Sequence, residues 1–172
     1  MKASSFPLYL VVLGCLLLVT PGAWSDAPPP LVGYRSLSPE LAMKLVRRTL
    51  EACRRHGYQV GVAVVDRSGL LQAYVRDRYA GPHTIEVAMR KAWTAASFRT
   101  DTLSLAQETR AGSPQSGIRW VGQAMMVGGG RPIEADGSLV GALGVSGAPS
   151  GALDDQCARE GLAAIEDELN LF

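Results

Sequence analysis

Apolar residues recur at helical spacing near both ends of the chain and form strand-like runs between them. Ser38-Pro39-Glu40 is typical of a helix start, with an N-cap hydroxyl, proline at the first helical position and an acid for the helix dipole. The apolar positions that follow predict one buried helix face, which Gly57 ends. That face consists of Ala42, Leu45, Val46, Leu50 and Cys53.

Two β-hairpins are indicated by short β-branched runs on either side of turn residues. Asp66–Gly69 forms the turn of the first hairpin and Asp136-Gly137 that of the second. A separate run before the glycine cluster 128–130 predicts one more strand. The five predicted strands span residues 60–65, 70–75, 123–127, 132–134 and 139–145.

Three further helices complete the pattern. A helix that opens at His83 carries mostly alanine on one side, which allows close approach to a sheet. A short helix is expected over 102–109, and a last helix carries Ala158, Leu162, Ile165 and Leu169. Hairpins flanked by helices predict an α/β protein of the α+β type, with an antiparallel sheet of about five strands.

The first residues have the features of a secretory signal peptide. Lys2 is the only charge before Asp26, and the apolar run 6–19 is shorter than the roughly 20 residues of a membrane span. Small residues before position 26 predict cleavage after Ser25, with an uncleaved anchor as the alternative. We therefore expect a signal peptide over 1–25, a proline-rich spacer over 26–36, one domain over 37–172, and a periplasmic or secreted protein.

Charge and motifs exclude several classes of function. The chain has 17 Lys and Arg against 16 Asp and Glu, so removal of Lys2 leaves a formally neutral protein. A neutral chain without a basic stripe is a poor nucleic-acid binder. The sequence contains no phosphate loop, no His-Glu-x-x-His and no Cys-x-x-Cys. No histidine follows Ser146, so its Gly-x-Ser-x-Ala context does not fit a hydrolase, and no catalytic residue is assigned.

Four sequence blocks, in one order, resemble the GlcG/HbpS family of haem-binding proteins, which also occurs as the C-terminal domain of PduO-type proteins. The blocks are Gly61–Gly69, Lys91–Ala96, Gly128–Ile133 and Gly141–Gly147. The resemblance extends from about Ser38 to Leu169. It implies a profilin-like or PAS-like fold, a homo-oligomer, and haem or a corrinoid-related compound as ligand.

The mature chain has two histidines, His56 and His83. His56 precedes Gly57 and is predicted to be a partly exposed helix cap. His83 lies where a polar loop enters a helix, so with the resemblance it is the candidate iron ligand of a non-covalent haem; a surface N-cap residue is the alternative. Other possible iron donors are Tyr79, Met89, Met125 and Met126.

Further haem contacts are expected near His83. Arg76, Arg78 and Lys91 could pair with haem propionates, although solvated surface charges are the commoner fate of such residues. Gly129 and Gly130 could allow the backbone to approach a planar ligand, or could simply connect two strands.

Cys53 and Cys157 are the cysteines that remain after signal cleavage, an even pair in an oxidising compartment. In the profilin-like fold that the resemblance implies, the terminal helices lie side by side. We therefore expect a disulfide, with two buried free thiols as the alternative.

The leading functional hypothesis is an exported small-ligand-binding protein that binds haem. One alternative is a PAS-like interaction module that reports to a partner such as a membrane sensor. The other is a small-molecule enzyme that acts on haem or on hydroxy acids, for which the sequence offers no convergent acid–base set.

Overall fold

The computed structural model describes residues 29–170. The chain divides into two units, residues 1–32 and 33–172, and the described helices and strands belong to the second. The predicted signal peptide and residues 26–28 lie outside the described part. Residues 29–38 contain no helix or strand.

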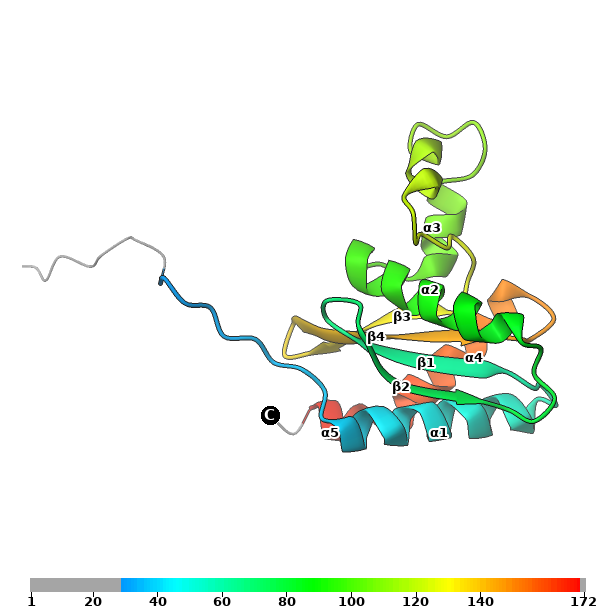
Figure 1. Ribbon diagram of the computed structural model, residues 1–172, viewed down its shortest axis with the longest axis horizontal. Coiled ribbons are helices and arrows are strands. Elements are labelled where there is room, and N and C mark those ends of the chain that lie inside the picture. Colours follow the sequence, from blue (N-terminus) through cyan, green and yellow to red (C-terminus); the bar gives the residue numbers. More distant parts are fainter. Residues whose placement is uncertain (1–28, 171–172) are drawn as a thin grey trace, which may run out of the picture. The chain divides into compact units, whose positions relative to one another are not determined.

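A four-stranded antiparallel sheet forms the centre of the domain (Figure 1). Its strands are β1 (Gly61–Asp66), β2 (Leu71–Arg76), β3 (Gly130–Ala135) and β4 (Ser138–Ser146). The order across the sheet is β2-β1-β4-β3. Both predicted hairpins are therefore confirmed, and β4 joins them by pairing with β1.

Helices cover both faces of this sheet. Helix α2 packs against β1, β3 and β4 on one face, whereas α1 and α4 pack against the other (Figure 1). The last predicted helix is divided in two at residues 164 and 165. The helices are α1 (Pro39–Arg55), α2 (His83–Phe98), α3 (Thr102–Glu108), the 3-10 turn η1 (Ser116–Trp120), α4 (Gly151–Ala163) and α5 (Glu166–Leu169).

The prediction of about five strands was wrong by one, because the run 123–127 is irregular. Its backbone bonds elsewhere: the amide of Met125 donates to Oγ1 of Thr94 on α2 at 2.9 Å. The apolar side chains of Ala124 and Met126 are buried with Leu105 of α3 in a small separate cluster. The apolar side chains of this run are thus buried against α3 and not in the sheet.

Both ends of α1 follow the sequence signals. The hydroxyl of Ser38 accepts a hydrogen bond from the amide of Leu41 at 3.2 Å, which satisfies one of the amides at the helix start. His56 is the C-terminal cap, and Gly57 has a φ of 79°, a left-handed conformation that suits glycine.

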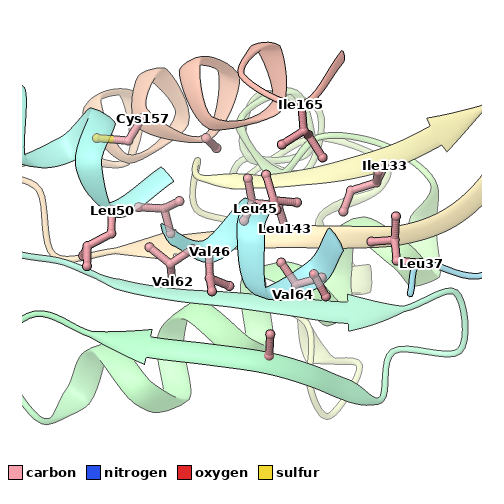
Figure 2. Close-up of a cluster of buried hydrophobic side chains, with 14 of the residues drawn as sticks. Leu37, Leu45, Val46, Leu50, Val62, Val64, Ile133, Leu143, Cys157 and Ile165 are labelled. Carbon is pink, nitrogen blue, oxygen red and sulfur yellow. The ribbon is translucent and has the colours of Figure 1, made fainter. Parts of the chain in front are cut away.

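Alternation along β1 creates two apolar layers. Val62 and Val64 face the main core, which α1 and α4 close (Figure 2). Ala63 and Val65 face the alanine side of α2. Gly144 of β4 allows that helix to lie close, because a Cβ there would be 2.0 Å from the backbone oxygen of Ala88.

A disulfide joins α1 to α4, as predicted. It links Cys53 to Cys157 across 104 positions of sequence, and both residues are fully buried. It thus connects the two helices that cover one face of the sheet.

Candidate functional site

The junction between β2 and α2 carries the predicted iron ligand. His83 is the first residue of α2, and its side chain is exposed. The ring lies against Gly81, where a Cβ would come within 2.7 Å of both Cε1 and Nδ1 of His83. No described group forms a hydrogen bond with the ring. The imidazole is therefore free to accept a ligand.

Asp77 holds this junction in place. Its carboxylate is buried and accepts hydrogen bonds from Nε and Nη2 of Arg54, at 2.7 and 2.8 Å. It also accepts from the amide of Arg78 at 2.8 Å, and its own amide donates to the oxygen of Val60 at 2.9 Å. The hydrogen bonds from Arg54 lower the pKa of Asp77. The loop is thus anchored to α1 and to the residue directly before β1.

Two more of the predicted haem contacts lie in this loop. Arg76, at the end of β2, donates a hydrogen bond to the backbone oxygen of Ala80. Arg78 and Tyr79 are exposed, and Tyr79 retains 80% of its accessible surface. The structure therefore places Arg76, Arg78 and His83 around one short loop, which we call the 76–83 junction.

Lys91 lies two helical turns further along α2 and is 1% exposed. Its Nζ donates to Oδ2 of Asp154 at 2.7 Å and to the oxygen of Val145 at 3.0 Å. Burial lowers the pKa of Lys91 and raises the pKa of Asp154, and the opposite charge of the partner counteracts each shift. Lys91 is thus a member of a buried ion pair and is not presented to the surface.

Gly129 and Gly130 surround this buried pair. A Cβ at Gly129, whose φ is 114°, would lie 2.7 Å from Cβ of Asp154 and 3.2 Å from Nζ of Lys91. A Cβ at Gly130 would lie 2.4 Å from the oxygen of Lys91. Both glycines allow the backbone to pack closely against protein groups. The expected contacts of Gly129, Gly130 and Lys91 with a ligand stay predictions.

The roles of two acids in α4 were not predicted from the sequence. Asp154 accepts from the amide of Ala148 at 2.9 Å as well as from Lys91, and Asp155 pairs with Arg131 at 3.0 Å. Both carboxylates are almost fully buried. The adjacent pair Asp154-Asp155 behind the N-cap Ser150 resembled ordinary first-turn acids, so the sequence held no signal for their partners.

Metal-binding clusters and membrane spans are both missing from the described residues. No group of three or more His, Cys, Asp and Glu side chains could hold a metal ion there. In the same part of the chain, no helix is both long and apolar enough to cross a bilayer.

Comparison with known proteins identifies the family. A family model described as "Haem degrading protein HbpS-like" matches residues 37–163. The crystal structure of a double mutant of HbpS from Streptomyces reticuli is 37% identical, with a TM-score of 0.75, and the match covers 84% of this chain and 99% of that one. The crystal structure of a PduOC:heme complex is 32% identical, with a TM-score of 0.71, and the match covers 76% of this chain and 95% of that one.

Curated relatives include longer proteins. Corrinoid adenosyltransferase PduO from Salmonella typhimurium is 32% identical over 124 residues, which is 71% of this chain and 37% of PduO. Protein GlcG from Escherichia coli is 30% identical over 110 residues, 64% of this chain and 81% of GlcG. The chain thus spans less than two fifths of PduO and most of GlcG. With the antiparallel sheet and its flanking helices, these matches place the chain in the HbpS-like family.

Proposed function

We propose that this protein binds haem non-covalently at the 76–83 junction, with His83 as the ligand to iron. The observation that carries the proposal is the exposed imidazole of His83, which has no hydrogen-bond partner among the described residues. Support also comes from the HbpS-like family and from the related PduOC structure that is titled as a haem complex. Neutral imidazole is a common protein ligand of haem iron.

The neighbouring side chains suit a haem. Haem has two carboxylates, and the guanidinium groups of Arg76 and Arg78 are the groups that pair best with carboxylates. Tyr79 and Ile85 provide exposed apolar surface, at 80% and 43% of their accessible area. Bound haem would supply an iron centre for electron transfer or oxygen chemistry, and the protein would bind and orient it.

Anchoring of the loop would keep this donor set in place. Asp77 stands between Arg76 and Arg78 in the sequence, and its carboxylate is bound by Arg54 on α1. The backbone that carries both arginines is therefore fixed at its middle residue. The hydroxyl of Thr84 donates to the oxygen of Gly81 at 2.7 Å, which fixes the turn before His83. A ligand would therefore meet a site whose backbone is already ordered.

Titration with hemin tests the proposal. His83→Ala should weaken hemin binding at least tenfold and shift the Soret band, because the iron loses its imidazole. His56→Ala is the matched control, since His56 is exposed too but its Nε2 lies 2.7 Å from Oε1 of Glu160. Circular dichroism checks that both variants fold. Unchanged affinity and Soret position in His83→Ala would exclude His83 as the ligand.

We also propose that the protein is exported to an oxidising compartment. The proposal rests on the signal-like sequence of residues 1–25. The disulfide between Cys53 and Cys157 supports it, because such bonds persist outside reducing compartments.

A further inference from the structure

A cavity of about 260 Å³ lies at the opposite end of α2 from His83. It is bordered by the β1–β2 turn, the last turn of α2 and the start of β4. Its volume is near the lower limit of small-molecule sites. Its polar lining groups are the side chains of Arg67, Ser68, Trp93, Ser97 and Arg99.

The two guanidinium groups of this cavity have no acidic partner. Neither Arg67 nor Arg99 forms an ion pair or hydrogen bond through its side chain with any described residue. Arg67 is instead positioned by Tyr34, since its Cζ lies 3.7 Å from the centre of that ring. No carboxylate lines the cavity in the described part of the chain. The arrangement thus gathers two positive charges without a protein counter-charge.

Nearby carboxylates are engaged elsewhere. Oδ1 of Asp66 accepts hydrogen bonds from the amides of Ser68 and Leu70, at 2.8 and 2.9 Å. Asp101 caps α3 and accepts from both the amide and the hydroxyl of Ser104. Many other arginines of the protein do form ion pairs, for example Arg54 with Asp77. Neither of these two carboxylates therefore neutralises Arg67 or Arg99.

The backbone at Arg99 is an independent observation. Arg99 caps the C-terminal end of α2 with a φ of 52° and a ψ of 37°, the left-handed conformation. This position usually holds glycine, and a side chain there costs roughly 1–2 kcal/mol. Arg99 lines the cavity from this position, and unusual backbone of this kind is concentrated at binding sites.

Trp93 and Gly69 form a rigid wall. A Cβ at Gly69, whose φ is 83°, would lie 2.6 Å from Cδ1 of Trp93, so only glycine lets the turn rest on the indole. The indole Nε1–H donates to no described group. The wall therefore offers a flat apolar surface with one free donor.

We infer that this cavity binds a small organic anion through a phosphate or carboxylate group held between Arg67 and Arg99. Guanidinium groups bind both of these groups with paired hydrogen bonds. The C-terminal dipole of α2 opposes an anion by about half a charge, which two full positive charges exceed. The site does not depend on haem, because Trp93 and Arg99 follow His83 by about 15 and 24 Å along the helix axis.

Nuclear magnetic resonance of the indole groups tests the inference. The Nε1–H signal of Trp93 is assigned by its loss in Trp93→Phe, and the protein is titrated with inorganic phosphate and, separately, with succinate, at constant ionic strength in chloride. The Trp93 signal should shift and saturate at millimolar concentration or below with at least one of the two. The stronger probe then identifies the acidic group of the ligand.

Variants separate this site from general charge effects. Arg67→Gln and Arg99→Gln should each weaken binding of the effective probe at least tenfold. Arg110→Gln is the control, because Arg110 is also exposed and without an ionic partner but lies beyond α3. Absence of saturable shifts with both probes would overturn the inference, as would an equal effect of all three variants. Hemin binding at His83 is unaffected by either outcome, so the two proposals fail separately.

Discussion

Replacement of Lys91 by methionine is expected to destabilise the protein more than any substitution of a surface charge. Lys91 and Asp154 retain 2% and 5% of their side-chain exposure, and their charged atoms are 2.7 Å apart. Lys91→Met removes one charge and leaves the other buried without its partner. Breaking a buried pair in this way costs about 3–5 kcal/mol, a large share of the 5–15 kcal/mol that is typical of a domain.

A double-mutant cycle gives the coupling between the two residues. Asp154→Leu should cost about as much as Lys91→Met, because it leaves Lys91 buried without its carboxylate partner. It also leaves the amide of Ala148 without its acceptor. The double variant Lys91→Met/Asp154→Leu should be more stable than the sum of the single changes predicts, because no isolated charge remains. Urea unfolding followed by circular dichroism gives each free energy of unfolding.

Surface and core pairs should differ in this assay. The control is Arg48→Ala, which breaks the half-exposed pair between Arg48 and Glu51 on α1 and should cost less than about 1 kcal/mol. Lys91→Met could instead cost less than about 1 kcal/mol, or the free-energy costs of the two single changes could simply add. Either result would refute the prediction that the buried ion pair couples Lys91 and Asp154.

Four further predictions concern the disulfide, acid stability, export and assembly. Cys53→Ala/Cys157→Ala should lower stability by up to about 4–5 kcal/mol, the loop-closure value for a bridge that spans 104 positions, and an unchanged urea midpoint would contradict it. Asp77→Asn should cost about 1–3 kcal/mol at pH 7. Arg54 lowers the pKa of Asp77 in the folded state. The stability that Asp77 contributes is therefore complete above its pKa in the unfolded chain, about 3.9, and is lost as the pH falls below that value. If Asp77→Asn costs the same free energy down to pH 2, the lowered pKa is not the source of that stability. N-terminal sequencing of the exported protein should begin at Asp26, and a chain that still starts at Met1 would disprove cleavage. Light scattering should give a multiple of the single-chain mass, whereas a monomer at micromolar concentration would exclude the homo-oligomer.

Local sequence signals predicted the elements well. The cap at Ser38, the break at Gly57 and the helix that opens at His83 each depend on residues within a few positions, so the pattern was sufficient. The disulfide was also predictable, because Cys53 and Cys157 are an even pair and the family resemblance implies terminal helices that lie side by side. The error at 123–127 arose because a short apolar run indicates burial without showing which element covers it.

Long-range partners could not be predicted from spacing. Lys91 and Asp154 are 63 positions apart, so the residues around Lys91 gave no sign of this partner. Arg99 presents the same problem, since nothing in the residues around it indicates a left-handed backbone. The closeness of Arg76, Arg78 and His83 could be predicted, because the three residues lie within eight positions of one another in the sequence.

The place of the last strand in the sheet has a consequence for folding. β4 lies between β1 and β3, and pairs such as Val62 with Val145 are 83 positions apart in the chain. Until β4 has been synthesised, the only ordered strands can be those of the first hairpin, which is marginally stable alone. Contacts of such long range form slowly, and the edge of β1 that later pairs with β4 remains open to other chains in the meantime. The strand order thus sets the period in which the new chain needs protection from aggregation.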